Sequence, residues 1–165
     1  MRDDGAGAAA LAALEAGWEL PVEVERLDLG TPGPYLAELL RGFEAILVFD
    51  TIKAAAPPGE VRLIAIDPHK PPPSVQRFTP HTPDLGEALA TLAFEDMAPT
   101  DVELIGVVPD VVDAGTELSE RVQKAVPLMA SLAAAELETL GFTIRRRDVA
   151  PMPTLWWERA EETLI

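Results

Sequence analysis

The feature that most constrains the fold is an alternation of strand-like and helix-like segments along the 165 residues. Continuous apolar runs and strict apolar–polar alternation predict strands, whereas apolar residues spaced three and four apart predict helices. The predicted strands cover residues 22–29, 44–50, 61–67 and 102–110, and the predicted helices cover residues 5–16, 34–42, 85–96 and 120–140. This order predicts an α/β fold in three layers, with a mostly parallel twisted sheet and helices on both faces.

The predicted organisation is a single domain over residues 1–148, followed by a C-terminal tail over residues 149–165. The length is close to the commonest size of one domain, and neither an internal repeat nor a domain boundary is visible. Trp156 and Trp157 in the tail are interpreted as an apolar clasp that packs the tail onto the domain.

Composition excludes several classes of function. The formal net charge of -15 opposes binding to nucleic acid and to anionic membrane surfaces. The chain has no cysteine, which excludes disulfides, thiolate nucleophiles and zinc–thiolate sites. No apolar run approaches the roughly 20 residues that span a bilayer. We therefore expect a monomer in the cytoplasm, without a nucleic-acid or membrane partner.

The chain opens at a point where a strand is expected to have ended. The segment "MRDDGAG" (1–7) has the character of a loop between a first strand and a first helix, but no strand precedes it. In doubly wound folds the first strand commonly lies in the middle of the sheet. The sequence thus predicts a domain that lacks its N-terminal strand, and we expect the natural protein to begin upstream of Met1.

Polar residues at the predicted strand ends mark a candidate site, because ligands of open α/β sheets bind beyond the carboxyl ends of the strands. These residues are Asp3, Asp4, Asp28, Asp50, His81 and Asp110. Carboxylates together with one imidazole make a plausible open site for a borderline ion such as nickel or zinc. The alternative interpretation is that the acids solvate loops and cap helices. His69 is interpreted as a histidine of a solvent-exposed loop.

Other chemistries lack their motifs. The sequence contains no phosphate-binding G-x-x-x-x-G-K-[ST] loop and no G-x-S-x-G nucleophile elbow. The fragment "GAGAAA" (5–10) is too weak a signal for a dinucleotide site.

Seven segments in order resemble the motifs of the hydrogenase maturation proteases. They are "MRDDGAG" (1–7), "LDLGTPG" (27–33), "ILVFDTI" (46–52), "PPGEVRLI" (57–64), "TPHTPDLGEAL" (79–89), "LIGVVPD" (104–110) and "GTELSERVQKAV" (115–126). Leu29 stands where that family usually has glycine, and the first half of the family's opening loop is absent.

The resemblance implies an endopeptidase that removes a C-terminal peptide from the precursor of a nickel-iron hydrogenase large subunit. It implies that Asp4, Asp50 and His81 are the catalytic and metal-contacting residues, and that Asp28 and Thr31 contact the substrate. The nickel would arrive with the precursor, and the protease would hold no stable cofactor of its own.

Two alternatives stay open at the level of sequence. One is a non-catalytic relative that holds the tail of a partner without cutting it, which the incomplete first loop favours. The other is a different hydrolase on a similar frame, such as a spore-type protease or an aminoacyl-ester hydrolase, which would act without nickel.

Overall fold

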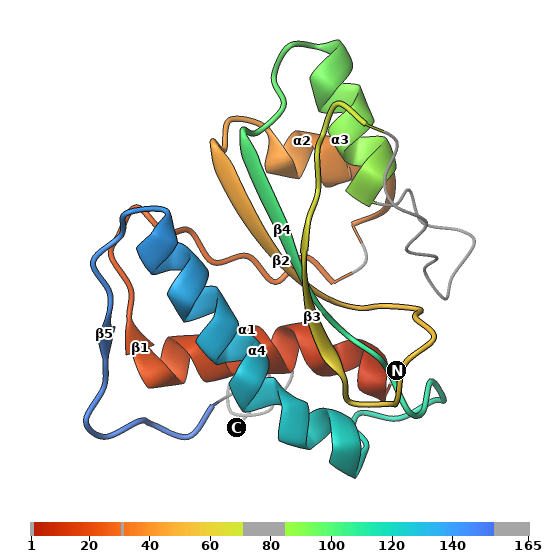
Figure 1. Cartoon of the computed structure of the whole chain (residues 1–165), viewed down its shortest axis with the longest axis vertical. Coiled ribbons are helices and arrows are strands. Elements are labelled where there is room, and N and C mark those ends of the chain that lie inside the picture. The colour runs from red at the N-terminus through yellow and green to blue at the C-terminus, as the bar shows by residue number, and fades with distance from the viewer. Residues whose placement is uncertain (1, 31, 71–84, 154–165) are drawn as a thin grey trace, which may run out of the picture.

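The computed structural model describes residues 2–30, 32–70 and 85–153, and its centre is a three-stranded sheet (Figure 1). The strands are, in spatial order, β2 (Ala45–Thr51), β4 (Asp101–Val107) and β3 (Val61–Ala65). β2 and β4 run parallel, whereas β3 runs antiparallel to β4. The α/β class is confirmed, and the parallel pair carries its two carboxyl ends to the same edge of the sheet.

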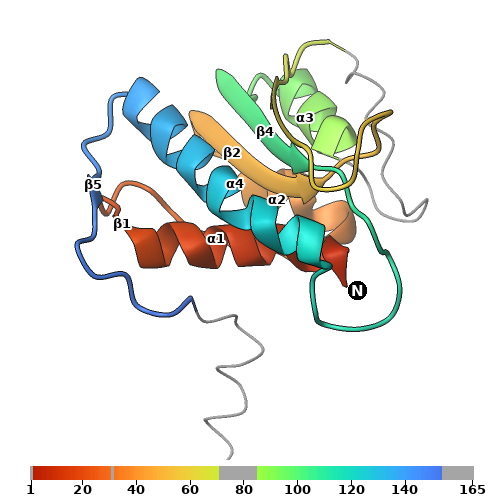
Figure 2. The ribbon, with the colours of Figure 1, turned by 60° about the horizontal axis from the view of Figure 1, so that its bottom comes forward.

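Helices cover both faces of this sheet (Figures 1 and 2). The helices are α1 (Ala6–Gly17) and α4 (Glu120–Thr139) on one face, and α2 (Leu36–Leu40) and α3 (Leu85–Phe94) on the other. Short 3-10 turns, η1 (Asp3–Gly5) and η2 (Gly33–Tyr35), lead into α1 and α2. The predicted arrangement of three layers is confirmed.

The central strand β4 supplies core side chains to both layers. Ile105 and Val107 pack against α1 and α4, whereas Val102 and Leu104 pack against α2 and α3. All four side chains are buried. Each buried aliphatic side chain of this size stabilises the fold by about 1.5–3 kcal/mol relative to exposure. The central strand is therefore packed from both sides.

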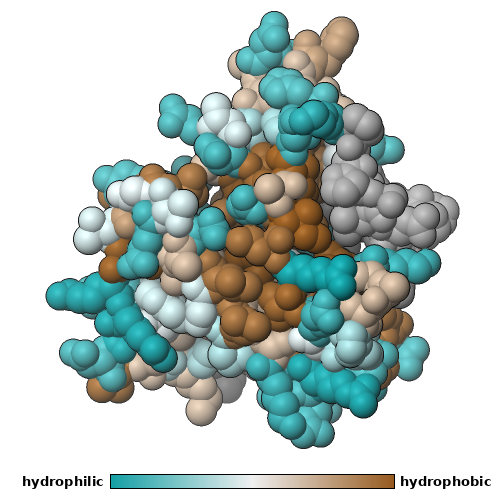
Figure 3. All heavy atoms as spheres, in the orientation of Figure 1, coloured by the Kyte–Doolittle hydropathy of each residue, from teal (hydrophilic) through white to brown (hydrophobic). Residues whose placement is uncertain are grey.

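The strand β2 is less covered than its sequence suggests. Its continuous apolar run is typical of a strand buried on both faces, yet Leu47, Val48 and Phe49 are only half-buried. Among the described strands, β2 pairs with β4 alone. Figure 3 shows apolar side chains gathered at the centre of one face of the molecule, with hydrophilic side chains around them.

The predicted strand over residues 22–29 is wrong. These residues form a turn and an extended connection with no strand, and the side chain of Val22 is 88% exposed. Alternation produces a strand only where a neighbour completes the backbone ladder, and no described strand pairs with this segment. The strand that does form nearby is β1 (Trp18–Glu19), which pairs antiparallel with β5 (Arg145–Arg146).

The long helix α4 forms as predicted and continues through Pro127. Ser119 is its N-cap, and its hydroxyl accepts a hydrogen bond from the Val122 amide at 3.4 Å. Gly141 follows the helix with a φ of +92°, a conformation that favours glycine. None of the helices in the described ranges is long and apolar enough to cross a bilayer.

Candidate functional site

The candidate site lies where the carboxyl ends of β2 and β4 meet the N-terminal turn η1. The turn contacts β2, and Asp3 in it bonds to the loop that follows β4. Figure 1 shows the N-terminus beside this edge of the sheet. The prediction that the opening acids approach the strand ends is therefore confirmed for Asp3, whereas the role of Asp4 stays a prediction.

Asp4 is the middle residue of η1 and is half-buried. The turn is closed by the Gly5 amide, which donates to the Arg2 carbonyl at 3.0 Å. Asp3 and Asp4 directly precede Gly5, which occupies the N-cap of α1, and no side chain caps that helix. The carboxylates of the turn therefore have other tasks than capping α1.

Asp50 is the penultimate residue of β2 and is half-buried. Its Oδ1 accepts a hydrogen bond from the Thr51 amide at 2.8 Å, which fixes the side chain beside its own strand end. Gly106 stands opposite Asp50 in the parallel ladder. A β-carbon on Gly106 would collide with the side chain of Ile52, so the neighbouring strand approaches Asp50 without a side chain of its own.

Asp3 was one of the polar residues predicted at this edge, but the family resemblance assigned the metal-contacting role to Asp4 and no role to Asp3. It is fully buried, and its Oδ2 accepts from the amides of Asp110 at 2.8 Å and Val111 at 2.7 Å. The amide and hydroxyl of Ser119 donate to Oδ1 at 2.6 Å and to Oδ2 at 2.9 Å.

The ionisation of Asp3 follows from these contacts. Burial by itself raises the pKa of Asp3, but the hydrogen bonds from the backbone of Ser119, Val111 and Asp110 and from the Ser119 hydroxyl outweigh it. The net result is a pKa below the ordinary value of 3.8. Asp3 is therefore a buried anion at neutral pH that is solvated by amide and hydroxyl groups in place of water.

Of the remaining predicted site residues, Asp110 meets Asp3 through its backbone amide, and its side chain lies elsewhere. Asp28 is exposed, and its Oδ1 accepts from the Gly30 amide at 3.2 Å in a local turn, so it does not end a strand. Asp110 is exposed and forms an ion pair with Arg121 at 3.2 Å. Thr31 and His81, like the Trp156–Trp157 pair of the tail, lie outside the described residues.

No group of three or more histidine, cysteine, aspartate or glutamate side chains within the described ranges is arranged to hold a metal ion. The predicted ligands that fall in these ranges are Asp4 and Asp50, and both offer carboxylate oxygens. Hard and borderline divalent ions accept such ligands, and an imidazole would complete a borderline site. The donor chemistry of these two acids therefore fits a divalent ion.

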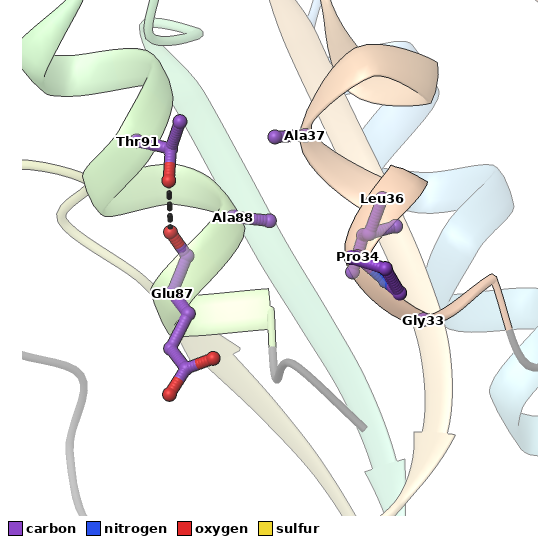
Figure 4. Close-up of a pocket in the computed structure, with 7 residues that line it drawn as sticks. All are labelled: Gly33, Pro34, Leu36, Ala37, Glu87, Ala88 and Thr91. Atoms are coloured by element: carbon purple, nitrogen blue, oxygen red, sulfur yellow. Dashed lines mark hydrogen bonds between the residues drawn. The ribbon is translucent and has the colours of Figure 1, made fainter. Parts of the chain in front are cut away.

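A small cavity of about 150 Å³ lies between α2 and α3 (Figure 4). Its walls are Gly33, Pro34, Leu36, Ala37, Glu87, Ala88 and Thr91. The Thr91 hydroxyl donates to the Glu87 carbonyl at 2.9 Å, so its polar group is already satisfied inside α3. Cofactor pockets usually measure about 300–1,000 Å³, so this cavity suits a single small apolar group.

Comparison with known proteins identifies the family of this chain. Residues 9–136 match the family model of the hydrogenase maturation proteases. The chain belongs to this family. The resemblance seen in the sequence is thereby confirmed, and the protein is a member of a family of peptide hydrolases.

Relatives of this protease agree with the assignment. It is 29% identical to the hydrogenase expression/formation protein HupD of Thiocapsa roseopersicina, over 88% of this chain and 66% of that protein. It is 26% identical to the hydrogenase 2 maturation protease of Escherichia coli, over 84% of this chain and 85% of the relative. The chain therefore spans about two thirds of the length of the first of these relatives.

Solved structures of maturation proteases share the fold. The hydrogenase maturating endopeptidase HybD of E. coli superimposes with a TM-score of 0.80 at 24% identity, over 89% of this chain and 91% of that one. The hydrogenase 2 maturation peptidase of a Thaumarchaeota archaeon gives a TM-score of 0.63 at 28% identity, over 86% and 91% of the two chains.

Proposed function

We propose that this protease removes the C-terminal peptide of a nickel-iron hydrogenase large-subunit precursor after nickel has been inserted into that precursor. The observation that carries the proposal is the position of Asp50 and of the Asp3–Asp4 turn at one edge of the sheet, in a chain that matches the maturation protease family. Acidic residues of two separate elements lie at the edge where this class of fold binds ligands.

In this proposal Asp4, Asp50 and His81 complete the coordination of the nickel that the precursor carries. The ion is part of the substrate, so the protease needs no stable metal of its own. Binding through the ion selects the nickel-loaded precursor, because the nickel-free form offers no group that these side chains recognise. Asp28 and Thr31 then contact the peptide next to the scissile bond.

The chemistry follows from the charge of the ion and the ionised state of the acids. A divalent ion beside the scissile bond polarises its carbonyl or activates a water molecule. The water oxygen adds to the carbonyl carbon, the carbon–nitrogen bond breaks, and the released amine takes up a proton. Asp50 is held by the Thr51 amide and is therefore oriented before the precursor binds.

The partner in this proposal is the hydrogenase precursor, and the protease acts as a monomer in the cytoplasm, where the precursor is matured. The net charge of -15 opposes a nucleic-acid partner.

The test is a cleavage assay on the purified precursor with and without nickel. We expect release of the C-terminal peptide from the nickel-loaded precursor alone. Binding of the precursor without peptide release would support the non-catalytic alternative. Equal cleavage of the nickel-free precursor would support a hydrolase that acts without nickel, and either result would overturn the proposal.

A further inference from the structure

We propose that Asp3 is the positioning residue of the candidate site, because its buried carboxylate fixes the turn that bears Asp4 against the loop after β4 and the first turn of α4. The inference rests on the proposed function, since its consequence is where Asp4 meets the nickel of the precursor. Asp3 itself is fully buried and touches no substrate.

The turn is held to the loop after β4 through both side chain and backbone. The carboxylate of Asp3 accepts from Asp110 and Val111, as described above, and the Asp3 amide donates to the Val111 carbonyl at 3.2 Å. The preceding amide, of Arg2, donates to the Asp113 carbonyl at 3.2 Å. Two consecutive residues of the N-terminal segment, Arg2 and Asp3, are therefore hydrogen-bonded to the same loop.

Ser119 extends the connection into α4. Its hydroxyl donates to Asp3 at 2.9 Å and accepts from the Val122 amide at 3.4 Å. A serine hydroxyl has a single proton, so giving it to Asp3 turns an oxygen lone pair toward the helix amide. The negative charge of Asp3 also lies at the positive end of the α4 dipole. The carboxylate of Asp3 thus orients the cap of a twenty-residue helix.

Asp4 depends on this arrangement because it is the next residue in a short closed turn. The Gly5 amide closes the turn on the Arg2 carbonyl at 3.0 Å, so Asp3 and Asp4 move as one unit. A shift of about 1 Å in a group that meets the reacting centre costs on the order of 100-fold in rate. The anchoring of Asp3 is therefore a condition for a defined position of Asp4.

The decisive experiment measures, by calorimetry, the affinity of the full chain for a large-subunit precursor of a nickel-iron hydrogenase whose scissile peptide bond is made resistant to cleavage, in its nickel-loaded and nickel-free forms. The dissociation constant of the nickel-free precursor divided by that of the nickel-loaded precursor reports the contribution of the nickel, and this quotient is called the ratio below. Asp3→Asn places an amide –NH₂ among groups that are themselves donors. We expect this change to lower the ratio about tenfold, within the range seen when partners of metal ligands are altered, with the nickel-free affinity unchanged within about twofold.

A matched control separates positioning from stability. Leu137→Ala opens a cavity in the core at the other end of α4, where it destabilises the fold without touching the turn. At a temperature where both variants are folded, Leu137→Ala should keep the wild-type ratio. A decrease of the ratio in Leu137→Ala equal to that in Asp3→Asn would show a merely structural effect and would overturn the inference.

A second pair of variants covers the case in which Asp3→Asn does not fold. Ser119→Thr keeps the hydroxyl and should keep the ratio, whereas Ser119→Ala removes one donor to Asp3 and should lower it. Equal ratios in the two variants and the wild type would overturn the inference. A wild-type ratio of one would overturn the proposed function itself, whereas a wild-type ratio above one that Asp3→Asn leaves unchanged would overturn the inference alone.

Discussion

Gly7 in α1 lies so close to Phe49 in β2 that a β-carbon built on Gly7 would stand 2.7 Å from the Phe49 carbonyl oxygen. No real β-carbon tolerates such an approach to backbone, so the helix and the strand pack at this distance only because residue 7 is glycine. The contact lies directly after η1 and one residue before Asp50. It therefore sets the spacing between the N-terminal turn and the end of β2.

Gly7→Ala should destabilise the protein, because the backbone of Phe49 has to move away from the added methyl group. We expect a loss of about 1–3 kcal/mol in the free energy of unfolding, the usual cost of overpacking, measured by urea denaturation. Gly17→Ala is the matched control at the other end of the same helix, where nothing lies within 4 Å of an added β-carbon. Equal effects of the two changes would contradict this account.

Asp50→Asn should abolish processing while the fold is retained. An asparagine keeps the oxygen that accepts from the Thr51 amide but loses the charge that faces the ion. We expect peptide release from the nickel-loaded precursor to fall by about 100-fold or more, since each 1.36 kcal/mol of lost transition-state stabilisation is a factor of ten. The thermal midpoint should stay close to that of the wild type, and full activity of the variant would remove Asp50 from the mechanism.

His81→Ala should also abolish processing and leave the fold intact, because the proposal assigns the imidazole to the substrate's nickel. The other histidine of the chain provides a control. His69 is exposed, and its amide donates to Asp67. His69→Ala should therefore keep full peptide release in the same assay, and a loss of activity in both variants would point to a general effect of removing a histidine.

Glu103 should make the protein less stable as the pH rises. Burial, together with the carboxylates of Glu136 and Asp101, raises the pKa of Glu103 above its ordinary value of 4.5. Between the ordinary pKa and the raised pKa, the folded chain holds the proton of Glu103 more tightly than the unfolded chain does. The free energy of unfolding therefore falls as the pH rises through the raised pKa. Glu103→Gln should therefore raise the thermal midpoint at pH 7, but it should not raise the midpoint at a pH below 4.5, the ordinary pKa of a glutamate.

The exposed Glu25 serves as the control for this comparison. In Glu25→Gln, the difference between the thermal midpoints measured at the two pH values should be the same as in the wild type. A Glu103→Gln variant whose thermal midpoint rises equally at both pH values would show that the change acts through packing and not through titration.

The elements that local pattern determines were predictable from the sequence. The helix over residues 120–140 was predicted with an interruption at Pro127, and the structure shows that α4 continues through this residue. β2 and β4 were predicted from short apolar runs. The prediction of a strand over residues 22–29 was wrong because a strand forms only beside a partner strand that completes its hydrogen-bond ladder, and no described strand pairs with this segment. Local periodicity carries no information about such a partner.

The site was predictable in kind but not in detail. Asp50 follows an apolar strand, and that position alone indicates the edge where ligands bind. The role of Asp3 was not predictable, because its partners stand 107 to 116 residues away and are mostly backbone amides. Any residue type supplies a backbone amide, so no sequence motif marks these donors.

The link from Asp3 to Ser119 also bears on when the protein becomes active. Ser119 is translated 116 residues after Asp3, and bacterial or eukaryotic ribosomes add about 5–20 residues per second. The N-terminal turn and the buried face of α1 therefore wait on the order of ten seconds before α4 emerges to receive them. A nascent chain therefore holds no completed candidate site until α4 has emerged and Ser119 has met Asp3.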